Sequence, residues 1–360
     1  MMTVDLEDEI AGNRLAGRRR TQPLGRPAPR LVYVGAIGVI VALIWPVVSW
    51  LRAPMDDPGD EAGAADAAAA LRPAPIDGAR AYGYLTQLCA LGPRPAGSEA
   101  NARQRRLVAD HFRALGGVVR EQPFTAHDPV SGAAVTMVNL VGSWSPARTE
   151  RVVLGAHYDT RPFPDLDPDP AQRRGTFVGA NDGASGVALL MEIAHHLNDS
   201  VTPWGVDLVL FDGEELVYDQ TGEYFLGSKE FARLYRAERR GKAPRSRYVA
   251  GIVLDMVGDR DLNIRQEPYS LRFNRPLVRD LWTIARRLGA GGFRNEVGPA
   301  VLDDHLALID AGIPAIDLID FDYPAWHTTQ DLPERCSGAS LNQVGRVVTA
   351  WLAKPKPRRR

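Results

Sequence analysis

The chain has 360 residues, of which 45% are hydrophobic and 24% are charged, so it can bury a sizeable core. Its formal net charge of −1 at pH 7 gives no reason to expect a nucleic acid as a partner. These values leave an ordinary globular protein with one large or two small domains.

The N-terminal part of the chain has the pattern of a membrane anchor. Residues 31–51 carry no charge, and a stretch of about 20 apolar residues spans a bilayer. Arginines precede this stretch and mainly acidic residues follow it. The positive-inside rule then places the N-terminus in the cytoplasm and the rest of the chain outside it, in the periplasm or the extracellular space. The alternative is a cleaved signal peptide.

This pattern divides the chain into five parts. We expect a basic cytoplasmic N-terminus over residues 1–30 and a single transmembrane helix over residues 31–51. A flexible linker rich in Ala, Asp, Gly and Pro should follow over residues 52–75. The folded domain should occupy residues 76–353 and end in a basic tail over residues 354–360.

The folded domain is predicted to alternate helices and strands. Ser98 is the expected N-cap of the second helix. In chain order, periodicity predicts helices over 77–91 and 99–115, strands over 118–124, 137–141 and 151–157, an amphipathic helix over 184–197, strands over 206–211 and 249–256, helices over 276–288 and 304–311, a strand over 313–318 and a helix over 341–352. This alternation predicts a three-layer α/β/α domain around a mostly parallel sheet.

The chain contains two cysteines, Cys89 and Cys336. If the folded domain lies outside the cytoplasm, a disulfide between them is permitted. It would tie the first helix of the domain to a segment near the C-terminus. Two free, buried thiols are the alternative.

Acidic and histidine residues follow the predicted strands. Because the carboxyl ends of parallel strands line the ligand crevice of an open α/β sheet, these side chains should converge. Carboxylates mixed with imidazoles, without a thiolate, suit zinc or a related divalent metal. Each residue alone has an ordinary explanation, such as a helix cap, but together they predict a metal-dependent enzyme. The residues are His157, Asp159, Asp182, Glu214, Glu215, Asp255, Asp303, Asp304, His305 and His327.

The adjacent pair Glu214 and Glu215 predicts two different roles. In an extended segment, neighbouring side chains point to opposite sides. One carboxylate can therefore bind a metal while the other faces the substrate as a base, which metal-assisted acyl transfer requires.

Together these motifs resemble the zinc-dependent peptidase family M28, which comprises aminopeptidases and glutaminyl-peptide cyclotransferases (glutaminyl cyclases). The resemblance covers roughly residues 77–353 and implies a single α/β domain with a central mixed sheet. It further implies that Asp182, Glu215 and His327 are zinc ligands and that Glu214 is the general base and acid. In two-zinc members of the family, the residues that match His157 and Asp255 complete a second metal site. The residue that matches Asp182 bridges the two metals.

Three features resemble the cyclase branch. The segment Leu216–Leu226 after the glutamate pair is long, the cyclase-like sequence Asp-Asp-His occurs at residues 303–305, and the run from Tyr323 to Thr328 contains Trp326 before His327. Two features depart from that branch. The tryptophan that cyclases carry shortly after the glutamate pair is missing, and Asp317 stands where the cyclase pattern has a histidine.

Two enzymatic functions follow from this resemblance, and both act on the N-termini of peptides or proteins. A cyclase would use one zinc, catalytic Glu214, Asp255 and Asp303, and a substrate pocket that includes Trp326 and Tyr323. An aminopeptidase would use two zincs, the second held by His157 and Asp255. A non-catalytic extracellular binding domain is the third alternative, which the complete set of site residues disfavours. We expect a monomer.

Overall fold

The computed structural model describes residues 71–219, 221–241 and 246–355. The expected cytoplasmic segment 1–30, the transmembrane helix 31–51, linker residues 52–70 and tail residues 356–360 lie outside these ranges. Within the described ranges, no helix is both long enough and apolar enough to cross a membrane.

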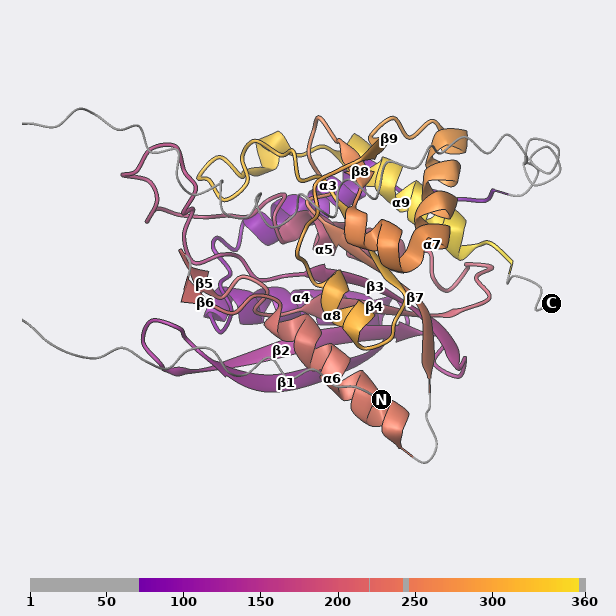
Figure 1. Ribbon diagram of the computed structural model, residues 1–360, viewed down its shortest axis with the longest axis horizontal. Coiled ribbons are helices and arrows are strands. Elements are labelled where there is room, and N and C mark those ends of the chain that lie inside the picture. The colour runs from indigo at the N-terminus through magenta and orange to yellow at the C-terminus, as the bar shows by residue number, and fades with distance from the viewer. Residues whose placement is uncertain (1–70, 220, 242–245, 356–360) are drawn as a thin grey trace, which may run out of the picture. The chain divides into compact units, whose positions relative to one another are not determined.

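A sheet of six strands forms the centre of the described part of the chain (Figure 1). Its order is β1-β2-β4-β3-β7-β10. The pairs β1–β2 and β2–β4 are antiparallel, whereas β4, β3, β7 and β10 are mutually parallel neighbours, so the predicted mostly parallel, mixed sheet is confirmed. The strands are β1 (Val118–His127), β2 (Ala134–Trp144), β3 (Glu150–His157), β4 (Gly205–Phe211), β7 (Arg247–Asp255) and β10 (Ala315–Ile319).

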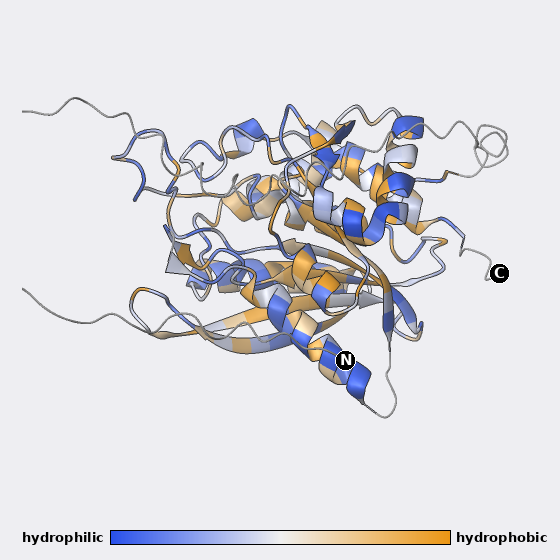
Figure 2. Cartoon of the chain, viewed as in Figure 1, coloured by the Kyte–Doolittle hydropathy of each residue, from blue (hydrophilic) through white to orange (hydrophobic). Residues whose placement is uncertain are grey.

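Helices cover both faces of the sheet, which gives the three layers (Figure 1). On one face lie α3 (Gly78–Cys89), α4 (Glu99–Ala114), α5 (Ala184–Ala194), α7 (Pro268–Leu288) and α9 (Gly338–Leu352), of which α4, α5 and α7 contact the strands. The other face packs against α6 (Leu226–Arg240) and α8 (His305–Asp310). Apolar residues concentrate in the sheet, while the outer surfaces of the helices are largely hydrophilic (Figure 2).

Helix α5 differs from its prediction as an amphipathic helix. Every residue from Ala184 to Ala194 is buried, because the helix contacts the sheet on one side and the helices α3, α4 and α9 on its other sides. Its length and position were predicted well, but its pattern belongs to a helix that is apolar on all sides. This burial holds the N-terminal end of α5, which follows Asp182, in a fixed place.

The helix predicted over 276–288 begins earlier, at Pro268. Its backbone leaves the helical region at Asn274, two residues before Pro276, so α7 is two helical pieces joined by a kink. Proline restricts the chain before it and removes a backbone donor, which explains this kink. The sequence pattern predicted only the second piece, which follows the kink.

Several elements were not predicted. They are the polar helix α6, the short hairpin of β5 (Val217–Tyr218) and β6 (Thr221–Gly222), the pair β8 (Ile264–Gln266) and β9 (Phe293–Val297), and a 3₁₀ turn over Pro333–Arg335. The hairpin β5–β6 lies in the long segment after Glu215.

The predicted disulfide is absent from the structure, since Cys89 and Cys336 are both free and buried. Burial raises the pKa of the Cys89 thiol to about 12, and it raises the pKa of the Cys336 thiol as well. Both side chains therefore behave as small, uncharged core residues.

Candidate active site

The predicted site residues meet at the carboxyl edge of the parallel strands. His157 ends β3, Asp255 ends β7, and the Glu214–Glu215 pair follows β4. Asp182, Glu215 and His327 offer ligand atoms that all lie within 4.8 Å of one another, and His157, Asp182 and Asp255 do the same. Five strand ends and loops distant in sequence thus form one cluster.

Two glycine turns aim the carboxylates into this cluster. Gly213 has φ of +71° before Glu214, and Gly183 has φ of +89° after Asp182, a backbone region that disfavours side chains. A Cβ on Gly213 would lie 2.4 Å from the sulfur of Met137. The chain can therefore turn sharply after β4 and before α5 only because these positions are glycine.

A buried carboxylate holds the backbone of the glutamate pair. The two oxygens of Asp159, which is fully buried, accept the backbone N–H groups of Glu214 and Glu215 at 3.0 Å each. These bonds fix the backbone at the start of the segment that follows β4. They leave the side chains of both glutamates free to act in the site.

A second buried carboxylate, that of Asp331, holds the Asp182 loop in the same way. It accepts the backbone N–H groups of Asn181 at 2.8 Å and of Asp182 at 3.1 Å. The hydroxyl of Tyr323, a predicted substrate-pocket residue, donates to Asp331 at 2.8 Å. The structure therefore places Tyr323, which is buried, as a support for the Asp182 loop.

His327 is held in a strained position. Its backbone has φ of +53°, which is unusual for a residue with a side chain and typical of functional sites. Its Nε2 lies 2.8 Å from Oε1 of Glu215 and 3.5 Å from Oδ2 of Asp182. The half-buried Trp326 ring lies against the imidazole, with 4.1 Å between the ring centroids.

The two oxygens of Asp182 face different histidines of the cluster. Its Oδ2 faces His327, while its Oδ1 lies 3.2 Å from Nε2 of His157. The same His157 nitrogen lies 3.2 Å from Oδ1 of Asp255. Burial opposes charge on His157, but hydrogen bonds that it donates to the carboxylates of Asp182 and Asp255 raise its pKa well above the ordinary value.

The two adjacent glutamates differ in their environment. Burial, followed by the charge of Glu215, raises the pKa of Glu214 well above its ordinary value. Burial also opposes charge on Glu215, but His327 and Arg161 outweigh it and lower the Glu215 pKa to about 2. Glu214 lies beside His157, with 3.8 Å between Oε2 and Nδ1. One carboxyl is thus a permanent anion and its neighbour can exchange a proton.

Asp303 lies at the edge of the cluster, before α8. Burial and then the charge of Asp255 raise its pKa to about 6. His305, two residues further on, lies 3.4 Å from Glu267 and 3.9 Å from Asp317, and it offers a ligand atom within 4.8 Å of those of Asp303 and Asp317. The Asp303 carboxyl is thus electrostatically linked to Asp255.

The donor set fits a zinc-like cation. Two carboxylates and one imidazole are the ligands of many catalytic zinc sites, which keep one position open for substrate. In addition, Oδ2 of Asp182 is buried and accepts no hydrogen bond from the described residues. A buried carboxylate oxygen without a donor is costly unless a cation or a proton meets it.

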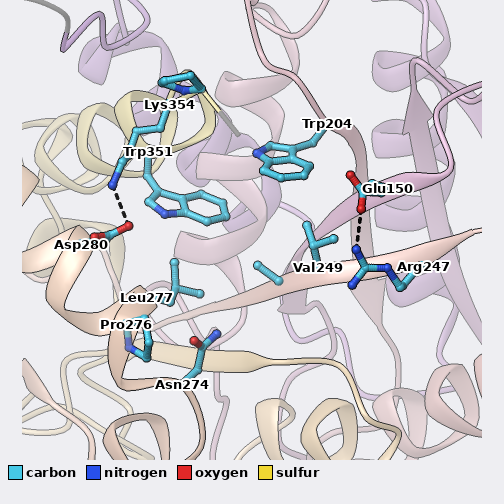
Figure 3. A pocket seen from close by; sticks show the side chains of 12 residues that line it. Glu150, Trp204, Arg247, Val249, Asn274, Pro276, Leu277, Asp280, Trp351 and Lys354 are labelled. Carbon is cyan, nitrogen blue, oxygen red and sulfur yellow. Dashed lines mark hydrogen bonds and ion pairs between the residues drawn. The ribbon is translucent and has the colours of Figure 1, made fainter. Parts of the chain in front are cut away.

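A separate hollow of about 420 Å³ lies at the opposite, amino end of the strands (Figure 3). It lies near Trp204 and Trp351, and the ion pairs Arg247–Glu150 and Lys354–Asp280 flank it. None of the predicted site residues lines this hollow, so the chemistry predicted from the sequence belongs to the carboxyl edge alone.

Sequence reasoning missed several supporting residues. Asp331, Arg94, Arg161 and Asp165 were not predicted as site residues. Arg94 is buried and donates to the backbone oxygens of Val178 and Gly179, just before Asp182. No periodicity marks such residues, because they lie in loops and act through backbone contacts.

Comparison with known proteins relates the chain to one family. The model of peptidase family M28 matches residues 139–352. A crystal structure of Fimbriiglobus ruber glutaminyl cyclase is 40% identical, with a TM-score of 0.76, over 79% of this chain and 97% of that chain. The glutaminyl-peptide cyclotransferase of Bothrops jararaca is 26% identical over 291 residues, which are 72% of this chain and 76% of that protein. A leucine aminopeptidase precursor from Bacteroides thetaiotaomicron is 30% identical, with a TM-score of 0.73, over 79% of this chain and 99% of that chain.

Proposed function

Because this chain belongs to peptidase family M28, in its glutaminyl cyclase-like branch, we propose that it converts the N-terminal glutamine of peptides or proteins to pyroglutamate and releases ammonia. The observation that carries the proposal is the position of Glu214. It lies next to His157, beside the group of Asp182, Glu215 and His327. A proton-exchanging carboxyl next to a complete ligand set is what this cyclisation requires.

Asp182, Glu215 and His327 are the residues that would hold a single zinc. When bound, zinc supplies a Lewis acid that polarises the γ-carboxamide carbonyl of the substrate glutamine. The Glu215 carboxylate suits a ligand because its low pKa keeps it anionic. The close contact between Trp326 and His327 makes the indole a wall beside the ligands.

Glu214 would move the proton. The α-amine of the substrate attacks its own side-chain carbonyl carbon, so a carbon–nitrogen bond forms and the carbon–nitrogen bond to the amide NH₂ breaks. Glu214 accepts the proton that the amine loses and donates it to the departing ammonia. Ring closure is intramolecular, so the site needs only to orient the substrate and polarise it.

Asp255 and Asp303 would hold the α-amine and the proton-transfer network. Asp255 lies 3.2 Å from His157, and its charge acts on Asp303. In this assignment His157 is a cationic support between two carboxylates. Tyr323 acts indirectly, since its hydroxyl holds Asp331, which in turn holds the Asp182 loop.

A specific observation favours aminopeptidase hydrolysis as the second candidate. Asp182 directs its two oxygens to two different groups, one with His327 and one with His157 and Asp255. This is the arrangement that a carboxylate bridging two metals would need. In that case His157 and Asp255 would be ligands, and Glu214 would activate water.

The two candidates differ in product and in metal content. The purified full-length chain is loaded with zinc and incubated with a glutaminyl dipeptide and, separately, with a leucyl chromogenic amide. The cyclase proposal predicts ammonia release, no cleavage of the leucyl amide and about one zinc per chain. Cleavage of the leucyl amide without ammonia release, together with about two zincs per chain, would instead establish the aminopeptidase.

A further inference from the structure

The loop after β3 contains a buried ion pair that the proposed reaction does not use. Arg161, which is 2% exposed, donates from Nε and Nη2 to the two oxygens of Asp165 at 2.7 and 2.9 Å. The planar guanidinium and the carboxylate thus form a two-bond fork. Burying such a pair costs desolvation energy that its attraction barely offsets, so stability alone does not explain it.

Arg161 is in direct contact with the proposed ligand Glu215. Its backbone N–H donates to Oε2 of Glu215 at 2.9 Å, and its Nη1 lies 3.5 Å from Oε1. The first contact occupies one carboxylate oxygen. Oε1, which faces His327, is left as the oxygen available to a metal.

Asp165 is in contact with the proposed ligand His327. Its Oδ1 lies 3.5 Å from Nδ1 of His327, on the side of the ring opposite to Nε2. The backbone N–H of the next residue, Leu166, donates to the carbonyl of His327 at 3.1 Å. The carboxylate is therefore held beside Nδ1, where it favours a proton on that nitrogen and leaves Nε2 as the ligand atom.

Arg161 also reaches the long segment Leu216–Leu226. Its Nη2 donates to the carbonyl of Asp219 at 3.2 Å and to the hydroxyl of Tyr224 at 3.2 Å. The guanidinium lies 5.6 Å from the centre of the Tyr224 ring. One cation thus joins this segment, the Asp165 carboxylate and the Glu215 carboxylate.

We propose that Arg161 and Asp165 are positioning residues that fix the ligand geometry of Glu215 and His327 and couple it to segment Leu216–Leu226. The backbone N–H of Arg161 occupies Oε2 of Glu215, and its guanidinium holds the Asp165 carboxylate and lies beside Oε1 of Glu215. Asp165 in turn favours Nε2 of His327 as the ligand atom. This inference rests on the ligand assignment made in the proposed function. It does not depend on whether the bound substrate is cyclised or hydrolysed.

The first test is the affinity for zinc, measured by chelator competition in the full-length chain without substrate. Asp165→Asn keeps the size of the side chain but removes its charge, and we expect the zinc dissociation constant to rise about 10- to 100-fold. Arg161→Lys keeps the charge but removes the fork, and it should change the affinity in the same direction. In the cobalt-substituted protein, both variants should alter the d–d absorption bands, which report the ligand geometry.

Arg174→Ala is the matched control. Arg174 lies in the same loop and donates to Asp219 at 2.7 Å, but it is exposed and contacts neither proposed ligand. Its variant should bind zinc with native affinity and show the native cobalt spectrum. Equal weakening by Arg174→Ala and Asp165→Asn would overturn the proposal, because general loosening of the loop would explain both. Native affinity in Asp165→Asn would overturn it as well.

The native chain provides a test that no folding defect can disturb. Nitrogen NMR of histidine-labelled, zinc-loaded protein reports which ring nitrogen of His327 carries the proton, with His327→Gln used to assign the signal. The proposal requires the proton on Nδ1, and a proton on Nε2 would overturn it. If the ammonia assay fails while Asp165→Asn still weakens zinc binding, the cyclase function is wrong and the positioning inference stands.

Discussion

Asp159→Asn tests the idea that a buried carboxylate sets the position of Glu214 and Glu215. Each oxygen of Asp159 accepts one backbone N–H, from Glu214 and from Glu215, at 3.0 Å. Asparagine keeps one acceptor but turns an NH₂ group toward the other N–H. Burial and the charge of Glu215 raise the pKa of Asp159 to about 6 despite His157, so measurements at pH 8 compare an ionised carboxylate with an amide.

The size of the effect follows from these two bonds. The variant loses one charge-assisted hydrogen bond and leaves one buried N–H without an acceptor, which together cost about 3 kcal/mol of unfolding free energy. The glutamate pair also loses its fixed backbone. A shift of about 1 Å in Glu214 would lower kcat by about 100-fold.

Asp207→Asn is the control for this experiment. Asp207 is buried in the first half of β4 and pairs with Arg151 at 2.6 Å, away from the carboxyl edge. Urea unfolding and kcat at saturating zinc are measured for both variants. Both should lose stability, but only Asp159→Asn should lose about 100-fold in kcat. If kcat stays within about threefold of the native value in Asp159→Asn, the positioning argument is refuted.

Four further predictions concern proton transfer, metal binding, pH and the membrane. Glu214→Gln should keep bound zinc but lower kcat by about 10²- to 10⁴-fold, and zinc loss measured in that variant would contradict the different roles of the two glutamates. His327→Ala should weaken zinc binding about 100-fold or more in the same chelator assay, and full retention of zinc would remove His327 from the ligands. Burial and then the charge of Asp159 raise the pKa of Asp212 from 3.8 to about 7, so the folded chain keeps a proton that the unfolded chain releases. The unfolding free energy of the metal-free chain should therefore fall by roughly a few kcal/mol from about pH 4 to 7, and Asp212→Asn should show a smaller fall in urea titrations. The anchor expected over residues 31–51 predicts that the full chain stays in the membrane fraction after a carbonate wash, and recovery in the soluble fraction would contradict it.

The sequence predicted the parallel part of the sheet and the meeting of the site residues because both depend on strand patterns. His157 and Asp255 end strands that are nearly continuous apolar runs, so their positions at the carboxyl edge follow from the topology. The position of Glu214 follows likewise from β4. Residues at or next to the end of a predicted strand could therefore be placed from the sequence.

The rest of the site depends on contacts between loops, which the hydrophobic periodicity of the sequence does not reveal. His327 reaches the cluster because Leu166 and Asp165, far away in sequence, hold its backbone and ring. Asp331 supports Asp182 through two backbone N–H groups. Helix α6 was missed for another reason, since its many charged residues hid the buried face, although Phe231 and Tyr235 have helical spacing.

A single peptide that can undergo both reactions distinguishes cyclisation from hydrolysis. A peptide that begins with glutamine can lose ammonia by cyclisation, or it can lose free glutamine by hydrolysis of its first peptide bond. Mass spectrometry of the products formed by the zinc-loaded chain separates the two. We predict a full-length peptide lighter by one ammonia and no shortened peptide. Free glutamine and a shortened peptide would contradict the cyclase assignment.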